Sequence, residues 1–365
     1  MLSLCLGACG GPSAPASRPP PGSDPVLAIA PYRCVLRDPT FAPRGALRDL
    51  TPWIARGPSG PRLVASRQRT DGALESFGLV VFDGPDVIER DLGVGAPGTL
   101  AWTPAGHLAL LRDRVVRYDD ALVREVGPRT TLGWPICDAA LVEGGDRTLA
   151  VWGRAAPGGG CLESTPWTQT FDARGAPLPP AAPLPTPEGV ARTASRSLRA
   201  RWDFGRFVVT AELVDGGARS WVLDPDGRAL GDAKDVVACP RSGCVRVLAA
   251  AERAGDNVDS LAQVIRVEPA TAASGGASFA TSTTAREVRG VVVSGDRMLV
   301  LHDTPSRAGC GLAVLDLSRR ATLSQFQDDT LTCAEAHVRA RPRGFVFAVN
   351  DPNRGVGSRA IDCTD

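Results

Sequence analysis

Short apolar runs separated by polar, turn-forming residues recur along this chain. Seven four-residue runs can be superimposed, at spacings of 45, 41, 59, 39, 52 and 46 residues, on Leu63, Leu108, Leu149, Val208, Val247, Leu299 and Phe345. Runs of this length bounded by turn residues are typical of β-strands rather than of helices. The pattern predicts an all-β chain built from a repeated unit.

Two further features recur around the runs. A glycine precedes each run, as a hairpin turn with positive φ requires, at Gly60, Gly106, Gly145, Gly205, Gly243, Gly295 and Gly344. A second strand-like segment follows each run and ends in an acid, at Asp83, Asp119, Asp172, Asp224, Glu268, Asp316 and Asp362. Each unit therefore predicts three strands, with a weaker fourth such as 87–90.

A repeat of about 40–50 residues built from four short strands resembles the β-propeller fold, and no named repeat family such as WD40 or kelch. The resemblance implies a seven-bladed β-propeller of four-stranded antiparallel blades over residues 26–365. The last unit stops after its third strand, which would leave an unpaired edge. The segment 32–37 is the expected donor, so that an N-terminal strand completes the last blade.

The cysteines test this closure. Eight remain when Cys5 and Cys9 are set aside, and an even number in an exported chain favours disulfides over a metal site, which would need closer pairs. Antiparallel pairing of the closing strands would bring Cys34 and Cys363 together. The other pairs that the blade model predicts are Cys239 with Cys244, Cys137 with Cys161, and Cys310 with Cys333. No metal and no cofactor is expected.

The segment Leu6-Gly7-Ala8-Cys9 resembles the lipobox of bacterial lipoproteins. The resemblance implies cleavage before Cys9 and lipidation of that residue, with 1–9 as the remnant of a signal peptide. Only eight residues precede Cys9 and none is basic, so a complete signal peptide needs a start upstream. Residues 10–25 are small, polar and proline-rich, as in a flexible tether. The expected location is the bacterial cell envelope, in the periplasm or on the outer membrane.

Composition changes this picture little. The chain has 40 glycines and 31 prolines, which agrees with many turns. Its net charge is +1, and the arginines are scattered among 40 acids rather than gathered in a stripe, so nucleic acid is not an expected partner. We expect a monomer that contacts the membrane only through its lipid.

Candidate chemistry is sparse. The adjacent His302 and Asp303 open a loop and could act as acid and base, but no G-x-S-x-G nucleophile motif accompanies them. Packing is the commoner use of a histidine in this position. Tryptophans in or near the first strands are candidates for a ligand face at the central channel, although they too more often pack between blades: Trp53, Trp102, Trp134 and Trp202.

The loops between second and third strands are polar and glycine-rich, and should project from one face of the ring. We therefore expect a non-catalytic protein that binds an envelope protein or polymer through this loop face. The alternative is a carbohydrate-active enzyme, a glycosidase or lyase, because acids converging from several blades need leave no linear motif. The loops are 69–76, 154–165, 214–219, 253–260, 303–309 and 350–357.

Overall fold

In the computed structural model, the described residues of the unit Arg33–Asp365 lie in strands, turns and the segments between them. Within 33–364 they exclude 43–49, 59, 72–73, 84–85, 91–98, 112, 134–135, 156–160, 162, 187–188, 191, 195–196, 215–216, 254–260, 271–277, 305–308 and 334–335. The predicted lipidation site Cys9 lies outside the described residues. No described segment is a helix of the length and apolarity needed to cross a membrane.

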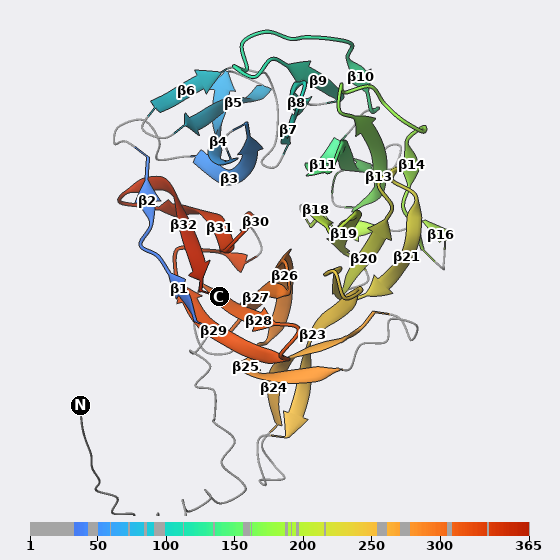
Figure 1. The fold of residues 1–365 in the computed structure, drawn as a ribbon. Coiled ribbons are helices and arrows are strands. Elements are labelled where there is room, and N and C mark those ends of the chain that lie inside the picture. Colours follow the sequence, from blue (N-terminus) through green and yellow to red (C-terminus); the bar gives the residue numbers. More distant parts are fainter. Residues whose placement is uncertain are drawn as a thin grey trace, which may run out of the picture. The chain divides into compact units, whose positions relative to one another are not determined.

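Six antiparallel sheets each arise from one continuous stretch of chain (Figure 1). The first three are β3–β6 (Leu50–Gly57, Gly60–Asp71, Leu74–Asp83, Asp86–Arg90), β7–β10 (Leu100–Thr103, Gly106–Leu111, Arg114–Tyr118, Thr130–Thr131) and β11–β14 (Ile136–Gly144, Arg147–Ala155, Glu163–Asp172, Ala182–Pro183). The others are β18–β21 (Arg199–Asp203, Arg206–Glu212, Ala218–Leu223, Ala229–Lys234), β22–β25 (Val236–Ala238, Val245–Arg253, Leu261–Pro269, Phe279–Thr284) and β26–β29 (Glu287–Ser294, Arg297–Asp303, Cys310–Asp316, Ala321–Asp328).

The sheet that closes the ring is composite. The strands β30 (Val338–Arg341), β31 (Gly344–Asp351) and β32 (Gly355–Cys363) come from the C-terminal end, and β1 (Cys34–Leu36) and β2 (Thr40–Phe41) both pair with β32. Val35 pairs with Asp362, and Cys34 with Cys363. The prediction of seven four-stranded blades is therefore wrong: six blades of four antiparallel strands are present, and the remaining sheet is a five-stranded closing sheet that both ends of the chain share.

The longest interval between units holds additional short strands. Between β14 and β18 lie β15 (Pro185–Thr186), β16 (Gly189–Val190) and β17 (Thr193–Ala194). The β17 strand joins β13 at the edge of its sheet, while β15 and β16 form a two-stranded sheet of their own. The extra length of the 59-residue spacing is therefore accounted for by edge structure.

First strands of successive sheets contact each other around the ring. The β3 strand contacts β7, β11 contacts β7 and β18, and β26 contacts β22 and β30. The β20 strand contacts β22, and β3 contacts β30, which completes the circle. Figure 1 shows these first strands on the inside of the ring and the fourth strands on its rim. The all-β propeller expected from the sequence is present.

The recurring glycines and acids have structural roles in the turns. All seven predicted turn glycines have positive φ, from 62° at Gly145 to 142° at Gly344. At Gly344 a Cβ would lie 1.9 Å from the Ile361 carbonyl oxygen, so only glycine fits. Some of the acids that end the third strands cap the next turn: the Asp172 carboxylate accepts hydrogen bonds from the backbone N–H groups of Arg174 and Ala176. Asp224 does the same for the turn that follows β20.

The core lies between neighbouring sheets and is built largely by the second strands. Leu108, Leu149, Val208, Val247 and Leu299 have no exposed surface. They alternate along their strands with residues facing the opposite sheet, so each blade buries both faces. The apolar runs that predicted the repeat are therefore the central layer of each blade.

All four predicted disulfides are present. Cys34 bonds to Cys363, Cys137 to Cys161, Cys239 to Cys244, and Cys310 to Cys333. The first joins residues 329 positions apart, and by restricting the unfolded chain it stabilises the closed ring. Four disulfides are consistent with an exported protein.

Candidate functional site at the channel mouth

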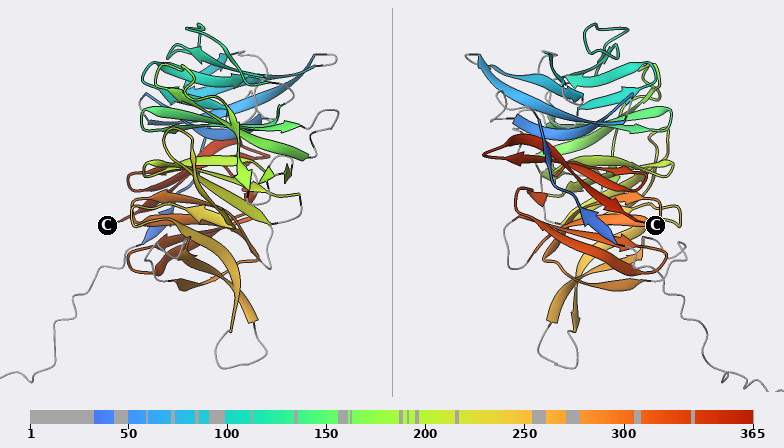
Figure 2. Two further views of the ribbon diagram at one scale, coloured as in Figure 1. Left: turned by 90° about the vertical axis from the view of Figure 1, so that its right-hand side faces the viewer. Right: turned by 60° about the vertical axis from the view of Figure 1, so that its left-hand side comes forward.

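The strands of each blade are antiparallel, so the last residues of the second strands and the first residues of the first and third strands lie at one end of the ring, here called the loop side. Figure 2 shows the long β4–β5 hairpin extending on this side. The hairpins that join first and second strands lie at the other end, the turn side. Because the sheet order is the same throughout the ring, every blade contributes the same type of connection to each side.

One arginine gathers three carboxylates at the mouth on the loop side. Register shifts between Val288 and Gly290, so Arg289 is the extra residue of a bulge in β26. Its guanidinium binds Asp303 at 2.8 Å, Glu287 at 3.0 Å and, from another blade, Glu212 at 3.1 Å. Burial opposes the charge of Arg289, but these carboxylates outweigh it and raise the pKa of this residue.

An arginine and a histidine lie near each other at the same mouth. The Arg199 guanidinium, at the start of β18, donates to the Cys333 carbonyl oxygen at 3.4 Å. His337, just before β30, is half-buried. Burial, followed by the charges of Arg199 and Arg339, lowers the pKa of His337 to about 4. The imidazole is therefore neutral at neutral pH.

Deeper in the channel, Arg339 of β30 links the inner strands of several blades. Its guanidinium binds the Glu143 carboxylate of β11 at 2.5 Å and donates to the Ile54 carbonyl oxygen of β3 at 2.7 Å. The same carboxylate accepts the backbone N–H of Trp102 in β7 at 3.1 Å. The Glu143 side chain is only 5% exposed. This network ties four blades together at the axis.

The predicted tryptophans do not form one surface. Trp53 is 2% exposed and packs in the core between blades. Trp102 is half-buried, with Arg56 over its ring, and Trp202 packs edge-on against Phe207 with ring centroids 4.6 Å apart. Trp134 lies outside the described residues. As ligand-face candidates the tryptophans remain a prediction, although those that the structure describes are used in packing.

The side chains of His302 and Asp303 point to opposite faces of the sheet, because the two residues are neighbours in β27. The His302 side chain is 3% exposed and packs against Gly311, where a Cβ would lie 2.4 Å from the ring, and burial lowers its pKa. Asp303 turns to Arg289 instead. Neighbouring residues in a strand face opposite sides of the sheet, so this pair is not aligned for acid–base work.

Other residues at the mouth were missed by sequence reasoning. Arg199, Glu212, Arg289 and Arg339 are ordinary members of an arginine-rich, acid-rich chain, and no local motif distinguishes them. Only the bulge and the ring closure bring them together. Among the described residues, no group of three or more histidine, cysteine, aspartate or glutamate side chains is arranged to hold a metal ion.

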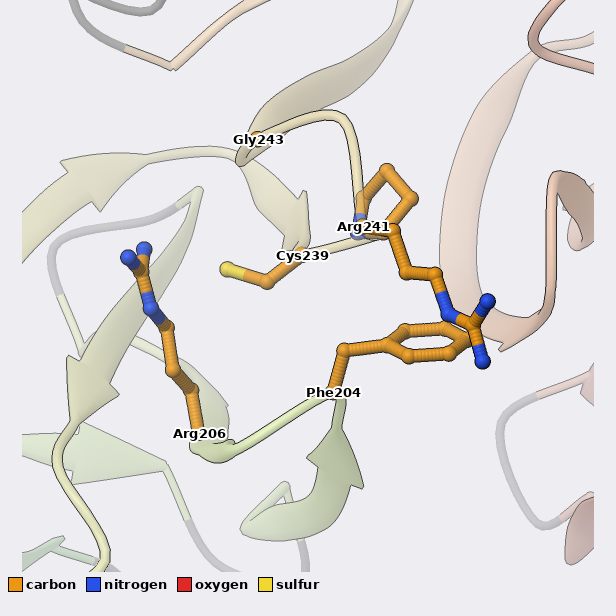
Figure 3. A pocket seen from close by; sticks show the side chains of 6 residues that line it. Phe204, Arg206, Cys239, Arg241 and Gly243 are labelled. Carbon is orange, nitrogen blue, oxygen red and sulfur yellow. The ribbon is translucent and has the colours of Figure 1, made fainter.

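A hollow of about 340 Å³ lies on the turn side, between the first hairpins of two adjacent blades (Figure 3). Sequence reasoning did not select it. The signal that could have found it is a phenylalanine in the tight turn Asp203-Phe204-Gly205-Arg206, at a position that asparagine or glycine usually occupies. The lining residues are Phe204, Arg206, Cys239, Pro240, Arg241 and Gly243.

Comparisons with known proteins support the fold and go no further. No protein-family model and no curated protein sequence matches the chain. A subtype N11 neuraminidase-like protein of the A/flat-faced bat/Peru strain is similar over 91% of this chain and 93% of that chain, with 9% identity and a TM-score of 0.52.

Two further solved structures are more distant. The Pan2 WD40 domain of Neurospora crassa covers 87% of this chain and 89% of its own, with 11% identity and a TM-score of 0.49. The polysaccharide lyase Uly1 covers 89% and 92%, with 8% identity and a TM-score of 0.49. At identities of 8–11% these likenesses concern the fold alone, and the comparisons determine no specific function. The chain has a β-propeller fold.

Proposed function

We propose that this chain is a non-catalytic binding protein of the bacterial cell envelope that engages an envelope protein or polymer through its loop side. The observation that carries this is the pairing of carboxylates at the channel. Glu143 is held by Arg339, and Glu212, Glu287 and Asp303 are held by Arg289. A glycosidase needs one carboxyl group free to donate a proton and a second carboxylate opposite it. Paired acids instead make a rigid polar platform.

Binding by the loop side is tested with a charge reversal at its rim. Glu212→Lys changes a half-exposed side chain at the mouth, and Asp146→Lys makes the same change at a turn on the other side. We expect Glu212→Lys to reduce binding to isolated peptidoglycan or purified envelope proteins, and Asp146→Lys to leave it unchanged. Equal binding by both variants would refute the loop side as the binding face. Release of reducing ends from a polysaccharide would favour the enzyme alternative.

The same proposal places the protein on a lipid anchor at Cys9, with 10–25 as the tether. The lipobox-like segment Leu6–Cys9 and the four disulfides support export. Cells expressing the full gene and fed labelled palmitate should incorporate the label into the wild-type protein and not into Cys9→Ser. Incorporation into both proteins would exclude Cys9 as the lipidated residue.

A further inference from the structure

The hollow on the turn side is built from two hairpins that belong to different blades. One is the β18–β19 turn, and the other is the β22–β23 loop between Cys239 and Cys244. Figure 3 shows Arg206 on one side, Phe204 with Arg241 on the other, and Cys239 between them. The hollow, at about 340 Å³, is at the small end of the range for ligand sites.

Phe204 is held in an unusual conformation. Its φ is 39° and that of Gly205 is 89°, as in a type I′ turn. Positive φ is uncommon for a bulky residue, which asparagine or glycine would adopt at lower cost. The Phe204 side chain is nevertheless 38% exposed, so this strain is not repaid by burial in the core. Its ring instead supports Arg241, whose guanidinium carbon lies 5.2 Å from the ring centroid.

The two hairpins are fixed to each other beneath the hollow. The Asp203 carboxylate, 2% exposed, accepts the Cys239 backbone N–H at 3.0 Å and an Arg201 N–H at 3.0 Å. The disulfide between Cys239 and Cys244 then closes the second hairpin into a short ring. Because this base is buried and cross-linked, the two hairpins that carry the exposed Arg206 and Arg241 are held next to each other.

Both rim arginines are free of carboxylates. Arg206 donates to the Cys244 sulfur at 3.1 Å, Arg241 lies over Phe204, and neither forms an ion pair with an acid among the described residues. None of the six lining residues is acidic. The equivalent arginine of the third blade differs: Arg147 follows the turn Gly145-Asp146 and is bound by Asp146 at 2.6 Å and by Asp226 at 3.6 Å.

We propose that this hollow, whose opposite sides carry Arg206 and Arg241, binds an oxyanion, the carboxylate, sulfate or phosphate group of a ligand. A guanidinium presents a planar fork of donors that matches two oxygens of such a group. Arg206 contacts the disulfide and Arg241 stacks on Phe204 before binding. The two side chains therefore lose less conformational entropy when the ligand binds. The oxyanion arrives either as a free ion or as a group on an acidic polymer.

The test is titration of the full chain with four probes: sodium sulfate, galacturonate, polygalacturonate and, as the neutral control, galactose. Arg206→Gln and Arg241→Gln should each weaken binding of the anionic probes by about tenfold, the loss expected when one charge-assisted hydrogen-bonding partner is removed. Arg147→Gln removes the same charge from the equivalent turn and should change binding less than about twofold. Melting temperatures establish that all three variants are folded.

Binding of sulfate or galacturonate that Arg206→Gln weakens identifies a site for free ions. Binding of polygalacturonate alone, with the same dependence on Arg206, supports the site and identifies the polymer as its source. The proposal is overturned if galactose binds as well as galacturonate, if no anionic probe binds, or if Arg147→Gln weakens binding as much as Arg206→Gln. None of these outcomes depends on the loop side.

Discussion

The channel mouth and the turn-side hollow use the same residue type in opposite ways. At the mouth, Arg289 is surrounded by three carboxylates, and deeper down Arg339 is bound to Glu143. In the hollow, Arg206 and Arg241 have no acidic partner among the described residues. Paired charges satisfy each other and hold the blades together, whereas unpaired guanidiniums are available to a partner from outside. Arginine content alone says nothing about either use.

The largest effect is expected when the Glu143–Arg339 network deeper in the channel is broken. In Glu143→Gln the Arg339 guanidinium remains in the channel without its counter-charge, and loss of one partner of a buried ion pair costs about 3 kcal/mol. Urea unfolding should show this loss of stability. Glu212→Gln removes only one of three carboxylates around Arg289, at a half-exposed position, and should cost about 0.5 kcal/mol or less. Similar effects of the two variants would mean that the channel network does not stabilise the ring.

A smaller effect comes from His337 as the pH falls. Its pKa is lowered from 6.5 to about 4 in the folded protein, so the unfolded chain takes up the proton first. The stability that the neutral ring contributes is complete above pH 6.5 and is lost as the pH falls toward 4. The loss of unfolding free energy is at most about 3 kcal/mol, and solvent screening of the half-buried ring reduces it.

His337→Gln removes this titration. Urea unfolding of both proteins between pH 7.5 and 4 should show that the variant loses less stability than the wild type, because the carboxylates titrate alike in both. If the two proteins lose the same stability over this pH range, burial does not suppress protonation of His337.

The smallest effect is expected from a substitution of Phe204 at the hollow, where the stability of the fold and the affinity for an anion should change in opposite directions. Phe204→Asn places a residue that tolerates positive φ in the turn and should raise stability by about 0.5–1 kcal/mol. The same change removes the ring under Arg241, so binding of galacturonate should weaken. Thermal unfolding and titration measure the two effects on one sample. A destabilised variant would show that Phe204 serves packing instead.

Several parts of the fold could be predicted because their causes are local. Positive φ at Gly106 or Gly344 is demanded by the hairpin itself, and an aspartate such as Asp224 caps the turn two to four residues later. Apolar runs such as 207–210 fill the central layer of a blade wherever that blade lies in the ring. The pairing of Cys34 with Cys363 followed from one assumption, that an open edge must be closed.

The site residues could not be predicted in the same way. Arg289, at a bulge in β26, reaches Glu212 in another blade 77 positions away, and Arg339 reaches Glu143 because the ring brings residues 196 positions apart together. The two hairpins of the hollow belong to separate blades, and a buried aspartate joins them. The lining of that hollow could therefore not be predicted from local sequence motifs.

The sequence by itself determined the repeated unit, its turns, the closing strand and the disulfide pairs, since each depends on local backbone geometry or on the pairing of neighbouring strands. Only the tertiary structure decided which charges are satisfied within the protein and which remain available. Arg147 and Arg206 occupy the same position in equivalent turns, yet the first is paired and the second is not. Asp146 is a neighbour of Arg147 in the chain, but Asp226 reaches it from the next blade, whereas the next blade brings the Cys244 sulfur to Arg206. The contribution of the neighbouring blade depends on the tertiary structure because electrostatic attraction acts through space and not along the chain.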